Sequence, residues 1–200
     1  MTKAVFLDRD GVINRKPSEG DYVTRLEDFH VLPGVVESIA QLNHAGFCVI
    51  VVTNQRCIAK GLMTVADLER MHRQMSESLA RAGAIINGIY YCPHEMEPTC
   101  SCRKPAPGML LDAALSRGIE LSASWMIGDS DIDVEAGRNA GCKTARLSAP
   151  NEAANEPGSC ADPSSAADIV ARSLFDAVRQ ILQWEGVAVS SFTAAPATQN

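Results

Sequence analysis

The chain is poor in aromatic residues, has no excess of positive charge and lacks long apolar segments. Phe, Trp and Tyr make up 5% of its 200 residues, and the formal net charge at pH 7 is −6. A negative chain without a basic cluster is a poor partner for nucleic acid or for an anionic membrane surface. No apolar run reaches the 18 residues of a membrane-spanning helix, and Asp8, Arg9 and Asp10 interrupt the apolar run nearest the N-terminus. We therefore expect a cytoplasmic protein.

Strand-like and helix-like segments alternate along the chain. Apolar runs at 3–8, 47–53, 84–91, 124–129 and 143–147 predict strands, and amphipathic stretches at 34–45, 64–82 and 107–117 predict helices. Another helix is expected after 129, and a short strand and a last helix after a loose connection at 149–165. This alternation predicts a three-layer α/β fold with a Rossmann-like, mostly parallel sheet. We expect one domain over 1–185 and a disordered tail at 186–200.

The helix predicted at 64–82 carries its own start signal and apolar stripe. Thr64 and Asp67 have the spacing of a capping box with Asp in the Glu role. The stripe is predicted to consist of Val65, Leu68, Met75, Leu79 and Ala82.

Polar residues end the predicted strands. In open α/β sheets, ligands bind beyond the carboxyl ends of the strands, so these residues are the candidates for a site. They are Asp8 and Asp10, then Thr53, Asn54 and Gln55, then Arg103 and Lys104 after a loop, and finally Asp129 with Ser130, Asp131 and Asp133. Residues i and i+2 of an extended chain point to one side, so Asp8 and Asp10 are predicted to face one site.

Three carboxylates in one cleft require a cation. Two unit charges 4 Å apart repel by roughly 4 kcal/mol at an effective dielectric constant near 20. Oxygen ligands favour Mg²⁺, and Mg²⁺ with a lysine and a hydroxyl suits a phosphoryl group. One carboxylate can then attack phosphorus while the second transfers protons. Any one of these polar motifs is also common in ordinary turns and helix caps. Their occurrence in order, each at the end of a separate predicted strand, favours the functional interpretation.

Four motifs resemble those of the haloacid dehalogenase superfamily of phosphohydrolases. They are DRDGVIN, VVTNQ, RKPAPGM and IGDSDIDVEAGRNAG, and the resemblance runs over about residues 3–147. It implies that Asp8 is the nucleophile and Asp10 the general acid/base, and that Thr53 and Lys104 hold the phosphoryl group. It also implies Mg²⁺ ligation by Asp8, the backbone carbonyl of Asp10, and Asp129, with Asp133 supporting the loop or Lys104. Thr53 follows Asp8 by 45 positions, which leaves no room for a large cap domain.

A cysteine- and histidine-rich loop at 92–102 precedes Arg103 and Lys104. Its ligands follow a Cys-x-His…Cys-x-Cys order and are Cys92, His94, Cys100 and Cys102. Three thiolates and an imidazole suit tetrahedral Zn²⁺, and a closed site of four protein ligands is structural. We expect the zinc to order the loop and so to position Arg103 and Lys104. The alternative is four unconnected residues in a reduced loop.

With no large cap and with this loop, the chain resembles two groups of the superfamily: the D-glycero-D-manno-heptose 1,7-bisphosphate 7-phosphatases and the related histidinol-phosphate phosphatases. The first group fits DRDGVIN…YV, TNQ and CxCRKPxPGM better, so removal of the 7-phosphate of the heptose bisphosphate is the first hypothesis. The substrate-binding residues that this implies are Asp8, Asp10, Tyr22, Thr53, Asn54, Gln55, Arg103 and Lys104. Arg56 and Cys57 depart from the usual Ser-Gly, and Ser130 stands where a Lys is often found.

Three alternatives stay open at this point: a histidinol-phosphate phosphatase, a phosphomutase, and a non-catalytic module whose zinc loop contacts other proteins. An open site admits water too readily to suit a phosphomutase, and a binding module has no need of the full catalytic set. We expect a monomer that acts on a small phosphorylated sugar, with no nucleic-acid or membrane partner.

Overall fold

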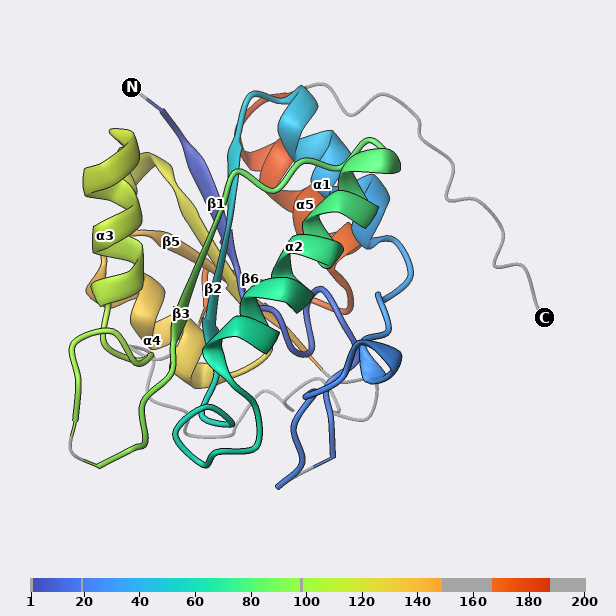
Figure 1. Ribbon diagram of the computed structural model, residues 1–200. Helices are drawn as coiled ribbons and strands as arrows, with labels where there is room; N and C mark the ends of the chain where they lie inside the picture. The colour runs from blue at the N-terminus through green and yellow to red at the C-terminus, as the bar shows by residue number, and fades with distance from the viewer. Residues whose placement is uncertain (1, 19, 98, 149–166, 188–200) are drawn as a thin grey trace.

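The computed structural model describes residues 2–18, 20–97, 99–148 and 167–187. Within these ranges, six parallel strands form one sheet in the order β3-β2-β1-β4-β5-β6 (Figure 1). The strands are β1 (Ala4–Leu7), β2 (Cys48–Asn54), β3 (Gly88–Cys92), β4 (Trp125–Gly128), β5 (Lys143–Leu147) and β6 (Ile169–Ala171). This arrangement confirms the predicted parallel α/β sheet.

Helices cover both faces of the sheet (Figure 1). They are α1 (Val35–His44), α2 (Val65–Arg81), α3 (Gly108–Arg117), α4 (Asp131–Asn139) and α5 (Leu174–Trp184), with short 3-10 turns at Leu26–Asp28 and Leu121–Ala123. One apolar cluster joins the sheet to α1, α2 and α5, and another joins it to α3 and α4. The three predicted layers are therefore present. None of the described helices combines the length and hydropathy needed to cross a membrane.

Strand β1 lies in the middle of the sheet, and its four residues are fully buried. Val5 and Leu7 pack on the side of α1 and α5, whereas Ala4 and Phe6 pack on the side of α3 and α4. The chain builds β1, β2 and β3 in one direction and then returns to place β4 on the other side of β1. The direction of strand addition therefore changes between β1 and β4, and open α/β sheets bind ligands at such a switch point.

The connection from β1 to β2 contains a loop, a 3-10 turn and α1, with no separate domain. This confirms that the fold has no large cap. Gly11 begins this connection with a φ of 95°. A Cβ atom there would overlap the carboxylate of Asp129, so the close approach of the two loops requires glycine.

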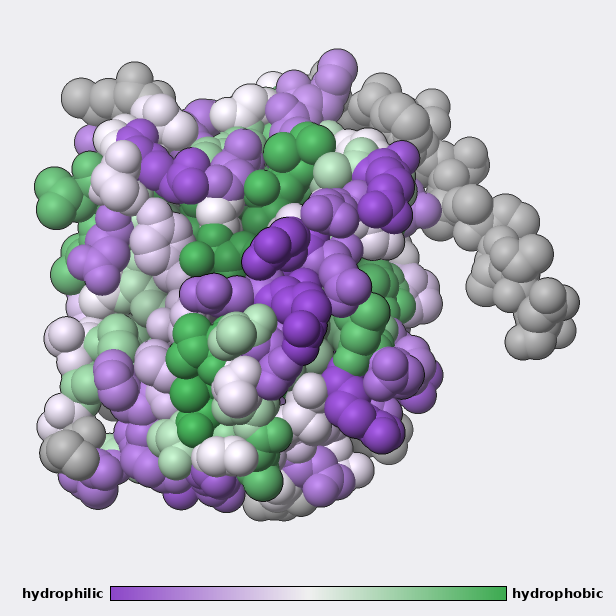
Figure 2. Space-filling model, in the orientation of Figure 1, coloured by the Kyte–Doolittle hydropathy of each residue, from purple (hydrophilic) through white to green (hydrophobic). Residues whose placement is uncertain are grey.

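Helix α2 confirms its predicted capping box: the Thr64 hydroxyl accepts a hydrogen bond from the backbone N–H of Asp67, and the Asp67 carboxylate accepts one from the backbone N–H of Thr64. The predicted apolar stripe is wrong at its ends, because Val65 and Ala82 are exposed. Figure 2 shows hydrophilic side chains gathered over α2, whose outer face carries Glu69, Arg70, Arg73, Gln74 and Glu77.

The strand predicted at 84–91 is also wrong in its first half, because β3 begins at Gly88. The Asn43 side chain bonds both the backbone N–H and the C=O of Ile85. The Asn87 side chain accepts a hydrogen bond from the backbone N–H of Val49. Side-chain amides thus replace part of the ladder that the apolar pattern suggested. The loose connection predicted at 149–165 lies outside the described residues, as does the predicted tail beyond Val187.

Candidate active site

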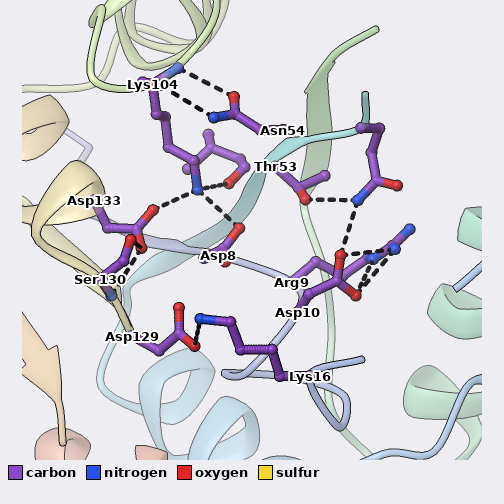
Figure 3. A network of polar contacts seen from close by, with 12 residues as sticks. Asp8, Arg9, Asp10, Lys16, Thr53, Asn54, Lys104, Asp129, Ser130 and Asp133 are labelled. Atoms are coloured by element: carbon purple, nitrogen blue, oxygen red, sulfur yellow. Dashed lines mark hydrogen bonds and ion pairs between the residues drawn. The ribbon is translucent and has the colours of Figure 1, made fainter. Parts of the chain in front are cut away.

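Lys104 links the first and fourth motifs at the carboxyl edge of the sheet (Figure 3). Its Nζ atom lies 2.8 Å from Asp8 Oδ1, 2.6 Å from Asp133 Oδ1 and 2.8 Å from the backbone oxygen of Val52. Three acceptors use all three hydrogens of the ammonium group. Burial alone would lower the pKa of Lys104, but Asp8 and Asp133 raise it above its usual value. Lys104 is therefore a fixed positive charge beside Asp8.

Asp8 lies just past the end of β1 and follows the alternation of the strand. Phe6 faces α3 and α4, and Asp8 faces the same side, where Lys104 and Asp133 meet it. Burial raises the pKa of Asp8 to about 7, with Lys104 lowering it and Asp133 raising it further. A divalent cation bound beside Asp8 would lower this pKa further than Lys104 does, because it adds positive charge that favours the ionised carboxyl group.

Asp129 completes a group of carboxylates with Asp8 and Asp133, whose candidate ligand oxygens all lie within 4.8 Å of one another. Three carboxylates at this separation suit a hard divalent cation such as Mg²⁺. Lys104 and Ser130 both bond Asp133, with Ser130 Oγ 2.5 Å from Asp133 Oδ2. Both oxygens of Asp133 are thus bonded, whereas Asp8 and Asp129 each have one oxygen in an ion pair, with Lys104 and Lys16, and one oxygen that remains for a metal. Asp133 holds Lys104, as expected from the resemblance.

The carboxylate of Asp10 turns away from this cluster (Figure 3). Arg9 Nη2 donates to both of its oxygens at 3.0 and 2.9 Å, Asn14 Nδ2 donates at 2.8 Å, and Gln55 Nε2 donates at 3.1 Å. Asp8 and Asp10 thus do not present their carboxylates side by side in this structure. These donors hold the Asp10 carboxylate in one orientation, and its predicted role stays a prediction.

Arg9 is fully buried and contacts α2 on its other side. Its Nη1 atom lies 3.2 Å from Nε2 of His72, which is 5% exposed. Burial, together with the positive charge of Arg9, lowers the pKa of His72 to about 3. A neutral imidazole can accept the Arg9 hydrogen bond at Nε2, whereas a protonated one could not. His72 therefore supports the guanidinium that orients Asp10.

The TNQ segment at the end of β2 connects the same groups. Asn54 bonds the backbone of Lys104 in both directions at 3.1 Å. Gln55 Nε2 donates to Thr53 Oγ1 at 2.9 Å as well as to Asp10. Thr53 and Gln55 are both buried. In this structure the Asn54 and Gln55 side chains position catalytic groups, and their predicted substrate contacts stay predictions.

Cys92, His94, Cys100 and Cys102 come together as the spacing predicts. Cys100 Sγ lies 3.6 Å from Cys92 Sγ and 3.4 Å from Cys102 Sγ, and His94 Nδ1 lies 3.6 and 3.3 Å from Cys92 and Cys102. Zinc–sulfur bonds of about 2.3 Å at tetrahedral angles place two sulfurs about 3.8 Å apart, so the cluster has the size of a zinc site.

The thiols of this cluster cannot all ionise without a cation. Burial and the neighbouring thiols raise the pKa of Cys102 to about 12. Burial also opposes ionisation at Cys100, but hydrogen bonds from Cys102 and the Arg103 backbone bring its pKa down to about 6. Soft thiolate donors of this kind favour Zn²⁺ over Mg²⁺.

The zinc loop contacts the predicted substrate-binding residues. Arg103 Nη1 donates to the backbone oxygen of His94 at 3.3 Å, and Arg56 forms an ion pair of 2.5 Å with Glu95. Arg56, the departure after TNQ, thus joins the β2 loop to the zinc loop. Tyr22 lies half-buried in the first loop with Lys60 Nζ 5.0 Å from its ring centre.

Sequence reasoning missed Arg9, Asn14, His72 and Lys16. Lys16 Nζ lies 2.7 Å from Asp129 Oδ2, from a position 113 residues away in the chain. The one available signal was the charged Arg9 directly after a buried strand, where the alternation predicts an inward side chain. Nothing local marks His72 or Lys16, because only tertiary contacts bring them to the site.

The class of enzyme follows from the fold, the site and a matching family model. A family model described as HAD-hydrolase-like matches residues 101–177, which include the third and fourth motifs. Together with the parallel sheet and the site at its switch point, this identifies a haloacid dehalogenase-like hydrolase, a phosphoric monoester hydrolase.

Relatives and solved structures then define the family. The D-glycero-beta-D-manno-heptose-1,7-bisphosphate 7-phosphatase of Photorhabdus laumondii is 38% identical over 185 residues, covering 89% of this chain and 94% of the relative. That of Escherichia coli K12 is 42% identical over 140 residues, covering 66% and 72%. The chain belongs to the family of these phosphatases. The D,D-heptose 1,7-bisphosphate phosphatase of B. bronchiseptica, solved with magnesium and phosphate, has a TM-score of 0.77 at 32% identity, covering 92% of this chain and 99% of that one.

Proposed function

We propose that this protein is a Mg²⁺-dependent phosphomonoesterase that removes the 7-phosphate of D-glycero-D-manno-heptose 1,7-bisphosphate. The observation that carries the proposal is Asp8 at the switch point, fixed 2.8 Å from Lys104 and within reach of Asp129. The relatives named for this activity supply the substrate. A small phosphorylated sugar is the kind of ligand that an open site without a cap domain can admit.

The first half of the reaction transfers the phosphoryl group to Asp8. A carboxylate oxygen of Asp8 attacks phosphorus, the bond to the sugar oxygen breaks, and Asp10, protonated and turned from Arg9 toward the site for this step, gives its proton to the leaving alkoxide. Lys104 balances charge beside the phosphoryl group, and the Thr53 hydroxyl, which already accepts from Gln55, donates its hydrogen toward it. Asp129, Asp8 and the backbone carbonyl of Asp10 would hold Mg²⁺, which supplies positive charge to the phosphoryl oxygens.

The second half hydrolyses the aspartyl-phosphate. Asp10, which gave up its proton in the first half, takes a proton from water as the water attacks phosphorus. The bond between phosphorus and Asp8 breaks, and phosphate leaves. The ion pair with Arg9 supports the carboxylate form of Asp10 that begins this second step.

The zinc cluster has a structural role in this proposal. Four protein ligands leave no position open for a reacting group. The loop is short and polar, and Arg103 and Lys104 follow it directly in the chain. Zinc binding therefore orders the segment that holds the phosphoryl-binding lysine. We further propose that residues 1–185 act as one domain, as a cytoplasmic monomer without nucleic-acid partners.

The test is a comparison of kcat/KM on the heptose 1,7-bisphosphate, histidinol phosphate and a panel of other phosphorylated sugars. We expect the heptose bisphosphate to be preferred, and phosphorus NMR should show the 1-phosphate retained in the product. Asp8→Asn should abolish turnover of every substrate, because an amide is a poor nucleophile. Asp112→Asn on the exposed face of α3 is the matched control and should behave as wild type. Preference for histidinol phosphate would overturn the assigned substrate, and turnover by Asp8→Asn would overturn the mechanism.

A further inference from the structure

The buried guanidinium of Arg9 forms hydrogen bonds on two sides. On one side, Nε and Nη2 donate to the Asp10 carboxylate at 3.2, 3.0 and 2.9 Å. On the other side, Nη1 faces α2, where it lies 3.2 Å from His72 Nε2 and 3.9 Å from the sulfur of Met71. A thioether is a weak acceptor, so His72 is the main acceptor for Nη1. Asp10 and His72 therefore set the orientation of Arg9 together.

His72 is suited to hold Arg9 because it is itself fixed and neutral. It lies on the buried face of α2, and its ring meets the ring of Tyr91 on β3 in a T-shaped contact with centroids 5.9 Å apart. Burial and Arg9 both disfavour the protonated imidazole, and the neutral form can keep a lone pair at Nε2 for Nη1. Two elements of the fold thus anchor a series of contacts that ends at Asp10.

This series of contacts is needed most when Asp10 leaves it. In the first half of the proposed reaction, Asp10 turns from Arg9 toward the site with its proton. Among the described residues, Asp10 is the one carboxylate that forms an ion pair with Arg9. A buried guanidinium without a partner is strongly destabilised. His72 remains as an acceptor, so Arg9 can stay in place, and the ionised Asp10 has the same partner to return to.

We propose that His72 is a positioning residue for the general acid/base. It holds the Arg9 guanidinium from α2, and through Arg9 it fixes the orientation of the Asp10 carboxylate between proton transfers. The inference rests on the phosphomonoesterase chemistry of the proposed function and deepens it. Lys104 and Thr53, which hold the phosphoryl group in that proposal, bond other partners. Loss of His72 should therefore impair protonation of the leaving group, with KM little changed.

The test compares variants that keep or remove the acceptor at position 72. The measured quantity is the ratio of kcat/KM for phenyl phosphate to that for p-nitrophenyl phosphate, with Mg²⁺ present. Phenolate is the more basic leaving group and gains more from protonation, so the ratio reports general acid catalysis and does not depend on the fraction of enzyme that is folded. We expect it to fall about tenfold to a hundredfold in His72→Leu. In His72→Gln, whose amide oxygen can accept from Nη1, it should stay at the wild-type value.

Two reference variants are measured with them. Asp10→Asn removes the acid itself and sets the largest fall in the ratio. Leu79→Ala removes buried apolar volume at the other end of α2 and should keep the wild-type ratio, which separates loss of the acceptor from loss of helix stability. If His72→Leu does not fold, His72→Phe takes its place, because a phenyl ring can keep the contact with Tyr91 and has no acceptor nitrogen. It should show the same fall.

A wild-type ratio in His72→Leu or His72→Phe, with a low ratio in Asp10→Asn, would overturn the role of His72 and leave the proposed function standing. An equal fall in His72→Gln and His72→Leu would overturn hydrogen-bond acceptance as the basis of that role. A wild-type ratio in Asp10→Asn would instead overturn Asp10 as the acid in the proposed function, and the positioning role with it.

Discussion

Replacing His72 with Gln should make the stability of the protein less sensitive to acidification. In the folded protein the pKa of His72 is about 3, because the imidazole is buried and its ring nitrogen contacts Arg9. The unfolded chain has the ordinary value of 6.5. Below pH 6.5 the unfolded state therefore binds a proton that the folded state does not. Stability that is present above pH 6.5 is lost as the pH falls toward 3.

The size of the effect at pH 5 depends mainly on the unfolded-state value. Between pH 6.5 and pH 5 the loss is about 1.5 pH units at 1.36 kcal/mol each, or roughly 2 kcal/mol. Any folded-state pKa well below 5 gives the same result. Glutamine cannot take up a proton, but its side-chain oxygen can still accept from Arg9 Nη1. The variant should therefore lose about 2 kcal/mol less than wild type when the pH is lowered from 8 to 5.

The assay is urea-induced unfolding of wild type and His72→Gln at pH 8 and pH 5. Taking the difference between the two proteins cancels the titration of every other group that the substitution leaves unchanged. His44→Gln is the control, because His44 is exposed at the end of α1 and an exposed imidazole keeps its hydration on folding. If His72→Gln and wild type showed the same pH dependence, His72 would not be a buried neutral partner of Arg9.

Three further changes test the reaction centre and the zinc loop. Asp10→Asn should reduce kcat by roughly 10²–10⁴-fold, with a residual rate that depends steeply on the basicity of the leaving group; a rate independent of the leaving group would exclude Asp10 as the acid. Chelation with EDTA should abolish turnover, Mg²⁺ should restore it and excess Ca²⁺ should inhibit, since Ca²⁺ prefers higher coordination numbers; full activity in metal-free buffer would contradict the carboxylate cluster as a metal site. Elemental analysis should find one zinc per chain in wild type and none in Cys100→Ser, whose KM should rise with the sheet still folded. Unchanged kinetics in a variant that has lost its zinc would refute the coupling between the zinc loop and Lys104.

Much of the fold and part of the site follow from local pattern. Apolar runs of strand length separated by amphipathic stretches specify parallel crossovers, and the capping box of α2 is a contact between residues three positions apart. The zinc cluster is also local, because two Cys-x-His or Cys-x-Cys pairs lie within eleven residues, from Cys92 to Cys102. The strand endings at Asp8, Thr53 and Asp129 converge because parallel strands end at one edge of a sheet.

Tertiary structure alone decided how the charged groups pair. Arg9 meets His72 across 63 residues, Lys16 meets Asp129 across 113, and no sequence spacing records either contact. Strand alternation predicts Asp10 beside Asp8, but the chain leaves the strand before Asp10, and the buried guanidinium of Arg9 holds the Asp10 carboxylate on the other side. An unpaired buried charge is strongly destabilising, so the orientation of a buried charged side chain follows the position of its partner in the fold. Local propensity determines which elements form, and the neutralisation of buried charge determines which way the catalytic side chains point.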